Sequence, residues 1–325
     1  MCDHQPTARL RDWALAACLT AFSLFGSTPA GAADGAAPPA APAKSAYSKT
    51  GADTCLDCHD EAAVAGIFKT AHGRPTNDAG PFGHGQLQCE SCHGPGDLHA
   101  NGKGKTRPHL IQFGKNALTS KAAQSEQCLS CHRDTAAHWG GNAHAANDVS
   151  CADCHKLHQA KDAVRDVATQ TDVCTSCHQA RKSDAMKSSH HPLREGKMAC
   201  SSCHAPHGST APAQLKKDSV NETCTTCHAE YRGPFLWEHG PVAEDCANCH
   251  QPHGSAQPAM LKTRAPFLCQ QCHEVQGHPA VSYTPDGLPG GSGTQRGAFL
   301  LAGSCLNCHS KVHGSNHPSG SKLMR

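Results

Sequence analysis

The sequence contains few of the large apolar side chains from which a protein core is usually built. Among its 325 residues are 21 Leu, 2 Ile, 10 Val and 8 Phe, about 13% of the chain, and aromatic residues make up 4%. A chain in which these aliphatic and Phe residues fall below roughly 20% buries too little apolar surface for an ordinary core and by composition resembles a disordered protein. The composition therefore excludes a conventional hydrophobic core.

Long apolar segments and a strong excess of one charge are also absent from the body of the chain. From Gly51 onward the longest apolar stretch is Ala298 to Ala302, whereas a membrane-spanning helix needs about 20 residues. We therefore expect the mature chain to make no direct contact with lipid. The formal net charge of +2 gives no indication of nucleic-acid binding.

Cysteine and histidine are abundant instead, with 22 Cys and 26 His. Twenty of the cysteines fall in ten CxxCH motifs, whereas chance would produce roughly 0.1 such motifs in a chain of this composition. The motifs are Cys55-Cys58-His59, Cys89-Cys92-His93, Cys128-Cys131-His132, Cys151-Cys154-His155, Cys174-Cys177-His178, Cys200-Cys203-His204, Cys224-Cys227-His228, Cys246-Cys249-His250, Cys269-Cys272-His273 and Cys305-Cys308-His309.

The CxxCH pattern is typical of covalent haem c attachment. Its two thiols add to the vinyl groups of the haem, and the adjoining His binds the iron as the proximal ligand. Zinc ribbons also use CxxC pairs, but they do not require a His directly after each second Cys. Structural disulfides explain neither the spacing nor the His. The sequence therefore predicts ten covalently attached haems, which would replace the missing core.

The N-terminal region has the pattern of an export signal. We interpret residues 1–32 as a signal peptide, with an apolar stretch from Trp13 to Gly26 and a cleavage site at Ala30-Gly31-Ala32. Lipidation at Cys18 and a retained anchor helix are alternatives, and the shortness of the apolar stretch weighs against both. Residues 33–50 form an Ala/Pro-rich tether, and residues 51–325 form the predicted haem domain.

Ten irons need ten second axial ligands. Methionines are scarce in the mature chain, so we expect bis-histidine coordination. The histidines outside the motifs follow a repeat in which each unit contains a CxxCH, a free His, a second CxxCH and a second free His. In chain order the predicted distal ligands are His72, His99, His144, His158, His191, His207, His239, His253, His278 and His313.

This repeat divides the haem domain into five modules of two haems each. The module boundaries lie at about 51–120, 121–168, 169–218, 219–263 and 264–325. About 29 residues per haem suffice for short helices and loops but not for sheets, and 30 Gly with 21 Pro favour the same architecture. The predicted fold class is a multihaem cytochrome c, mostly coil with short α-helices and little or no β-structure, forming an elongated haem wire. We expect helices to begin at or near the motifs.

The spacing between the second free His of a module and the preceding motif His indicates which haem the free His binds. In modules two to four it follows the motif His by three residues, and in module five by four. We expect a helical turn to place the two imidazoles on one side, so that the second His binds a neighbouring haem.

Some distal positions have competitors. His84 competes with His72, and His109 with His99, whereas His191 is preferred over His190 because Pro192 follows it. We expect the five histidines that remain in the mature chain to be solvated on the surface: His84, His109, His138, His190 and His317.

Several segments resemble the decahaem cytochromes of the MtrA/DmsE family. They are residues 219–255 (SVNETCTTCHAEYRGPFLWEHGPVAEDCANCHQPHGS), 263–273 (TRAPFLCQQCH) and 304–320 (SCLNCHSKVHGSNHPSG), and the resemblance covers about residues 51–325. The IFKTAHG segment at 67–73 resembles the family's first distal-ligand segment and favours His72. His317 also resembles a family His, so its exclusion rests on the module count.

The resemblance implies ten bis-histidine haems in a file inside an outer-membrane β-barrel porin. The implied partners are that porin, a cell-surface multihaem cytochrome, and periplasmic or inner-membrane cytochromes that exchange electrons with the chain. The implied location is the periplasm, in association with the outer membrane through the porin. In this role the chain would serve extracellular metal reduction or ferrous iron oxidation.

Two other functions remain as alternatives. A soluble periplasmic carrier could feed a terminal reductase such as a DMSO-type reductase. A multihaem reductase acting on nitrite or hydroxylamine would need an open iron position, and ten available distal histidines disfavour it. We therefore expect an electron-transfer protein without catalytic residues.

Overall fold

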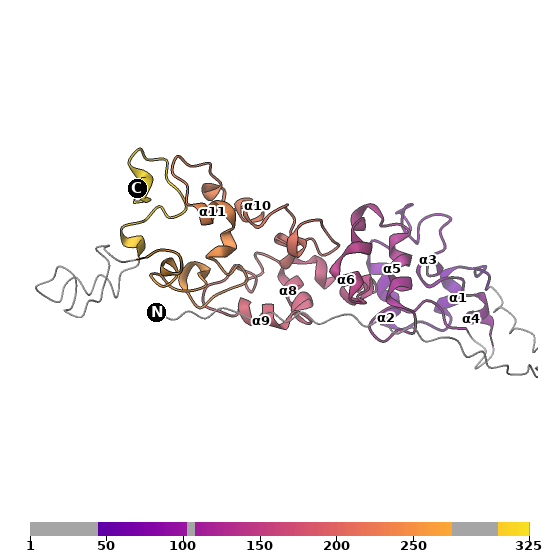
Figure 1. Cartoon of the computed structure of the whole chain (residues 1–325). Helices are drawn as coiled ribbons and strands as arrows, with labels where there is room; N and C mark the ends of the chain where they lie inside the picture. Colours follow the sequence, from indigo (N-terminus) through magenta and orange to yellow (C-terminus); the bar gives the residue numbers. More distant parts are fainter. Residues whose placement is uncertain (1–44, 103–107, 275–304, 325) are drawn as a thin grey trace, which may run out of the picture. The chain divides into compact units, whose positions relative to one another are not determined.

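A computed structural model of the chain describes residues 45–102, 108–274 and 305–324. The predicted signal peptide 1–32, most of the tether 33–50 and the predicted ligand His278 lie outside these ranges. Within the described residues the backbone consists of short helices joined by long loops (Figure 1), and β-structure is confined to isolated bridges. This agrees with the predicted fold class.

The longest helices have nine residues, and most have fewer than seven. The α-helices are α1 Ala52–Leu56, α2 Ala62–Ala65, α3 Glu90–His93, α4 Asp97–Asn101, α5 Lys121–Leu129, α6 Ala143–Ala146, α7 Cys151–Cys154, α8 Val167–Thr175, α9 Gln179–Ala185, α10 Val220–Thr225 and α11 Gly240–Glu244. The 3-10 helices are η1 Gly66–Lys69, η3 Asp134–Ala136, η4 Trp139–Gly141, η5 Ala163–Arg165, η6 Cys200–Ser202, η7 Pro212–Gln214, η8 Ala229–Tyr231, η9 Cys246–Asn248, η10 Pro258–Met260, η11 Cys269–Gln271, η12 Cys305–Asn307 and η13 Gly320–Lys322.

The two motifs of a module have different local structures. Helices begin at or next to the second motif of every module, in α3, α7, η6, η9 and η12. The first motifs of modules one to four instead lie at the C-terminal ends of α1, α5, α8 and α10. The expectation that helices begin at the motifs is therefore wrong for these first motifs.

Capping residues upstream of the first motifs explain this difference. Ser120 accepts a hydrogen bond from the Ala123 N–H at the start of α5, and Ser219 accepts one from the Glu222 N–H at the start of α10. Asp166 caps α8 in the same way through the Ala168 N–H. Ser and Asp at these positions satisfy main-chain donors that a helix leaves unpaired. These helices therefore start four to seven residues before the first motif Cys and end within the motif.

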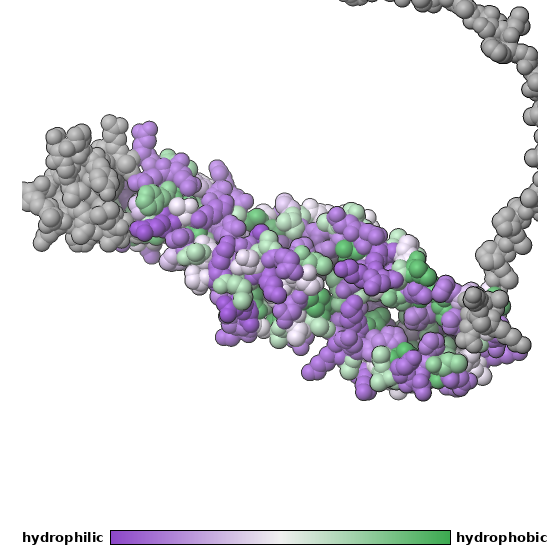
Figure 2. All heavy atoms as spheres, turned by 90° about the horizontal axis from the view of Figure 1, so that it is seen from below, coloured by the Kyte–Doolittle hydropathy of each residue, from purple (hydrophilic) through white to green (hydrophobic). Residues whose placement is uncertain are grey.

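The interior contains little apolar side-chain surface. Among the described residues, the buried hydrophobic side chains are Ala52, Phe82, Trp139, Ala185, Ala199 and Leu215. The face drawn in Figure 2 shows hydrophobic residues scattered among hydrophilic ones. The protein part alone therefore has no core of ordinary size, as the composition predicts.

Candidate functional site

The motif residues line one large hollow. Its volume is about 4700 Å³, and all twenty motif cysteines lie on its wall. All ten motif histidines and the nine described distal candidates also line it. Of the five histidines that we excluded as ligands, only His109 reaches the wall.

The histidines on this wall meet in pairs, each of one motif His and one distal candidate. The ring centroids of the nine pairs are 5.9 to 6.4 Å apart. An iron bound by two imidazoles needs about this spacing, because each metal–nitrogen bond is about 2 Å long and each nitrogen lies about 1 Å from its ring centre. The pairs are His59–His99, His132–His72, His93–His158, His178–His144, His155–His207, His228–His191, His204–His253, His273–His239 and His250–His313.

Most of these pairs join different modules. The first free His of modules one to four lies against the first motif His of the following module. The second free His of modules two to five lies against the second motif His of the preceding module. Module one is the exception, because its second free His, His99, lies against its own first motif His, His59. Only His309 among the described motif histidines has its predicted distal candidate, His278, outside the described residues.

The local structure of the second free histidines differs from the prediction. His158, His207, His253 and His313 lie in turns rather than on a helical turn. The motif helices are too short to continue through the following three residues, because α7 ends at Cys154 and η6 at Ser202. The chain turns away after the motif and carries the second His toward the neighbouring module.

A hydrogen bond at Nδ1 orients many of these imidazoles. When Nδ1–H donates to an acceptor, Nε2 remains unprotonated and can bind a metal. The main-chain carbonyl acceptors lie 2.6 to 3.1 Å away: Ile111 for His93, Pro108 for His99, Pro206 for His144, Val64 for His158, Pro252 for His191, Ala213 for His204, Val312 for His239, Ala259 for His250 and Lys322 for His309.

The excluded histidines have other environments. His84, His109, His138 and His317 are exposed. His190 is half-buried, contrary to the expectation of a solvated residue; its Nδ1 bonds the Lys187 carbonyl at 2.6 Å, and its Nε2 lies 3.4 Å from a Glu195 carboxylate oxygen. The Nδ1 of His317 lies 2.8 Å from the Ser319 hydroxyl, within hydrogen-bonding distance, and 3.2 Å from the Ser319 N–H, from which it accepts a hydrogen bond. Its Nε2 then carries the proton. His313 rather than His317 lies against a motif His, at 6.1 Å from His250.

Burial keeps several of the paired imidazoles neutral. It lowers the pKa of five histidines of the pairs: His72, His93, His207, His253 and His313. The neutral imidazole is the form that binds a metal. The hollow therefore favours the ligating protonation state.

The motif thiols connect the modules in chain order. Within each module the first Cys of one motif contacts the first Cys of the other by a thiol hydrogen bond: Cys55–Cys89, Cys128–Cys151, Cys174–Cys200, Cys224–Cys246 and Cys269–Cys305. Between modules the second cysteines approach each other. Burial raises the pKa of Cys92, Cys154, Cys203 and Cys249, and the neighbouring thiol of the next module adds to the rise, in the pairs Cys92–Cys131, Cys154–Cys177, Cys203–Cys227 and Cys249–Cys272. All ten motifs are thus neighbours in the order of the sequence.

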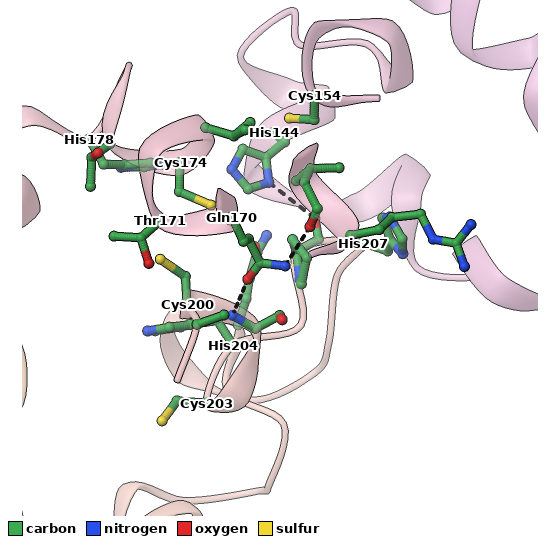
Figure 3. Close-up of a pocket in the computed structure, with 18 of the residues that line it drawn as sticks. His144, Cys154, Gln170, Thr171, Cys174, His178, Cys200, Cys203, His204 and His207 are labelled. Carbon is green, nitrogen blue, oxygen red and sulfur yellow. Dashed lines mark hydrogen bonds between the residues drawn. The ribbon is translucent and has the colours of Figure 1, made fainter. Parts of the chain in front are cut away.

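Buried amide side chains hold the paired motifs together, and our sequence reasoning did not identify them. Gln124 on α5 is 1% exposed; its side-chain oxygen accepts a hydrogen bond from Ser150, which caps α7. Gln170 on α8 accepts a hydrogen bond from the Ser201 N–H, and it lies beside the Cys174 and Cys200 thiols (Figure 3). Asn221 on α10 accepts one from the Cys246 N–H. The sequence signal is an amide three or four residues before the first motif Cys.

The cavity fits a series of large cofactors. A tenth of its volume is about 470 Å³, within the roughly 300–1,000 Å³ of ordinary ligand pockets. Each pair of imidazoles faces across a gap of the right size for one metal, and a CxxC pair lies next to each motif His. The residues present therefore fit haem c.

Other kinds of metal site are not evident. The described residues contain no group of three or more His, Cys, Asp or Glu side chains that could hold a metal ion. The motif cysteines form no disulfides among the described residues. No helix in the described ranges has the length and apolarity to cross a membrane.

Comparison with known proteins gives matches along most of the chain. The doubled CXXCH motif family matches residues 190–233 and 239–278, and the family described as cytochrome c-type protein NrfB-like matches residues 89–169. The multiheme cytochrome MtrA of Shewanella baltica is 51% identical over 282 residues, which cover 86% of this chain and 83% of the relative. The cytochrome c-type protein NrfB of Escherichia coli is 29% identical over 112 residues, 33% of this chain and 54% of that protein.

Proposed function

The chain belongs to the family of the multiheme cytochrome MtrA, and from this membership we propose that it conducts electrons through ten bis-histidine haems across the outer membrane. It is a multihaem electron-transfer cytochrome with covalently bound haem c rather than an enzyme. The number of haems, the axial ligands and the partner are parts of the proposal.

The paired histidines carry the proposal. When bound, haem c supplies the reversible one-electron chemistry of its iron. The two imidazoles of each pair would occupy both axial positions, so that no substrate could bind the metal. The proposed distal ligands are His72, His99, His144, His158, His191, His207, His239, His253, His278 and His313. The nine described ones each lie opposite a motif His. We assign His278 to His309 because these two remain after the nine pairs.

The order of the motifs supports conduction rather than storage at separate sites. The thiols of each motif lie near those of the next, so electrons would pass between neighbours along the chain. Nine steps that each advance roughly 5 Å exceed the ~40 Å thickness of a bilayer with its headgroups. For this function the chain needs a β-barrel porin around it, because loop backbone exposed to the hydrocarbon of the membrane would leave many polar groups without hydrogen bonds.

The proposed location is the periplasm, in association with the outer membrane through this porin. The proposed exchange partners are a cell-surface multihaem cytochrome on one side and periplasmic or inner-membrane cytochromes on the other. Membership of the MtrA family supports this arrangement.

Affinity capture of the tagged protein from the native membrane tests the proposed partner. We expect a β-barrel protein to be captured in equal amount, and the purified pair in liposomes should reduce an enclosed electron acceptor from outside. Capture of a soluble reductase without a barrel, and no electron transfer across the vesicle, would instead establish a soluble carrier.

A further inference from the structure

The second motif His of each module lies in an equivalent position, so the five sites can be compared directly. In modules one, three, four and five its Nδ1–H donates to a main-chain carbonyl further along the chain. The pairs are His93 with Ile111 at 2.8 Å, His204 with Ala213 at 2.9 Å, His250 with Ala259 at 2.7 Å and His309 with Lys322 at 2.6 Å. Four of the five sites thus present a neutral acceptor.

Module two presents a charged acceptor instead. The Nδ1–H of His155 donates to Asp162 Oδ2 at 2.6 Å. The other oxygen of Asp162 accepts a weaker bond from the Lys156 main-chain N–H at 3.3 Å. The Asp162 side chain is 13% exposed, so its carboxylate acts in a partly desolvated environment.

Nearby cations point to other groups. The Lys156 ammonium bonds the Ala152 carbonyl at 2.7 Å rather than the Asp162 carboxylate. The positive charge of Arg165 acts on His72 and contributes to lowering its pKa. On the opposite side of the gap, His207 packs against the buried Trp139 at 6.4 Å between ring centroids.

We propose that Asp162 is a positioning residue that gives the haem attached at Cys151 and Cys154 the lowest reduction potential of the five second-motif haems. A carboxylate that accepts the Nδ1 proton makes the imidazole a stronger donor, and stronger donation favours the ferric over the ferrous iron. The inference rests on the proposed bis-histidine function and adds a specific potential step at the fourth motif. Because its reduction potential is low, the haem at the fourth motif passes electrons on to its neighbours and does not store them.

Redox titration of the full-length holoprotein tests the proposal. In Asp162→Asn, one tenth of the absorbance change should move to a more positive potential, because one haem in ten loses its charged acceptor. Asp162→Glu keeps the charge and should restore most of the wild-type curve. Asp166→Asn is the matched control, since it removes an exposed carboxylate nearby and keeps the helix cap of α8.

In the titration, an unchanged curve for Asp162→Asn would overturn the proposal, and so would an equal shift in Asp162→Asn and Asp166→Asn. Haem content and the low-spin spectrum separate these results from failure of the proposed function, which would appear as missing haems or a high-spin fraction in the wild type. The wild type also provides a test that needs no variant to fold. One tenth of its low-spin ferric EPR signal should show a larger ligand-field splitting than the rest, and the absence of such a component would also contradict the proposal.

Discussion

Many of the proposed ligand histidines donate a hydrogen bond from Nδ1. Nine of them donate Nδ1–H to main-chain carbonyls, and His155 donates to a carboxylate, which leaves Nε2 unprotonated. This hydrogen bond is not exclusive to them, because the excluded His190 also donates from Nδ1 to the Lys187 carbonyl. The proposed ligand His253 instead accepts at Nδ1 from Arg181, as His317 does from the Ser319 N–H. Module counting favoured His313 at this position, and the 6.1 Å spacing of His313 from His250 supports the same choice.

Single substitutions at the distal positions should therefore have a discrete effect. His253→Ala or His207→Ala should each convert one haem in ten to a high-spin form that binds carbon monoxide when reduced, because one axial position opens. Absorption and EPR spectra measure this fraction. The controls His84→Ala and His138→Ala should keep the wild-type spectrum.

In module five the same test decides between two candidate ligands, His313 and His317. We expect His313→Ala to produce the high-spin fraction and His317→Ala to leave the spectrum unchanged. The opposite pattern would show that His317 is the ligand there.

At this scale the sequence alone identified most of the candidate site. CxxCH spacing names the twenty thiols and ten proximal histidines, and the repeat names the distal candidates. The pairing could not be predicted, because eight of the nine pairs join a distal candidate to a motif His of another module, and the turns of the chain decide which one. Asp162 was missed because a carboxylate seven residues after a motif has no distinctive spacing, and the exposure of His190 was overestimated.

At the scale of the helices, polar contacts replace apolar packing. Gln124 joins α5 to the start of α7, and Gln170 and Asn221 make the equivalent connections in the next two modules. We predicted short helices from the sequence, but we expected the first motifs to lie at helix starts, whereas in modules one to four they lie at helix ends. The capping residues Ser120, Asp166 and Ser219 are the sequence signal for where these helices start.

Gln124→Ala should lower the free energy of unfolding by about 1–3 kcal/mol, because it leaves the half-buried Gly114 N–H without its acceptor and leaves the buried Ser150 hydroxyl with Asp153 alone as an acceptor. Denaturant titration of the holoprotein measures the change. Glu126→Ala on the exposed side of the same helix is the control and should change stability by less than about 0.5 kcal/mol. Equal effects of the two substitutions would show that Gln124 has no special structural role.

The loop after His253 depends on a glycine. Gly254 has φ +131°, and a Cβ there would collide with the Asp184 carbonyl on α9. We expect Gly254→Ala to displace His253 and to produce a high-spin fraction of about one haem in ten, since L side chains disfavour this backbone conformation. Gly140→Ala, where a Cβ meets open space, should leave the spectrum intact. An unchanged spectrum in both variants would contradict the structural requirement at Gly254.

At the scale of the whole molecule, the hollow explains the composition. The chain lines about 4700 Å³ of space with thiols and imidazoles, and it buries six apolar side chains in the described residues. The proposed ligation by histidine pairs that join different modules would make each module dependent on its neighbours. Folding and haem attachment should therefore be coupled.

Protein expressed without the haem-attachment machinery should consequently be unfolded. Far-ultraviolet circular dichroism measures its helix content, which should be close to that of a random coil and show no cooperative thermal transition. A cooperatively folded apoprotein would contradict the coupling of folding to haem attachment.

The number of electrons that one polypeptide takes up tests the central claim most directly. The account predicts that coulometric reduction of the purified holoprotein stores ten electrons per chain reversibly, with neither nitrite nor hydroxylamine turned over by the reduced protein. Reversible uptake of fewer than ten electrons, or sustained turnover of either compound, would contradict a series of ten bis-histidine haems.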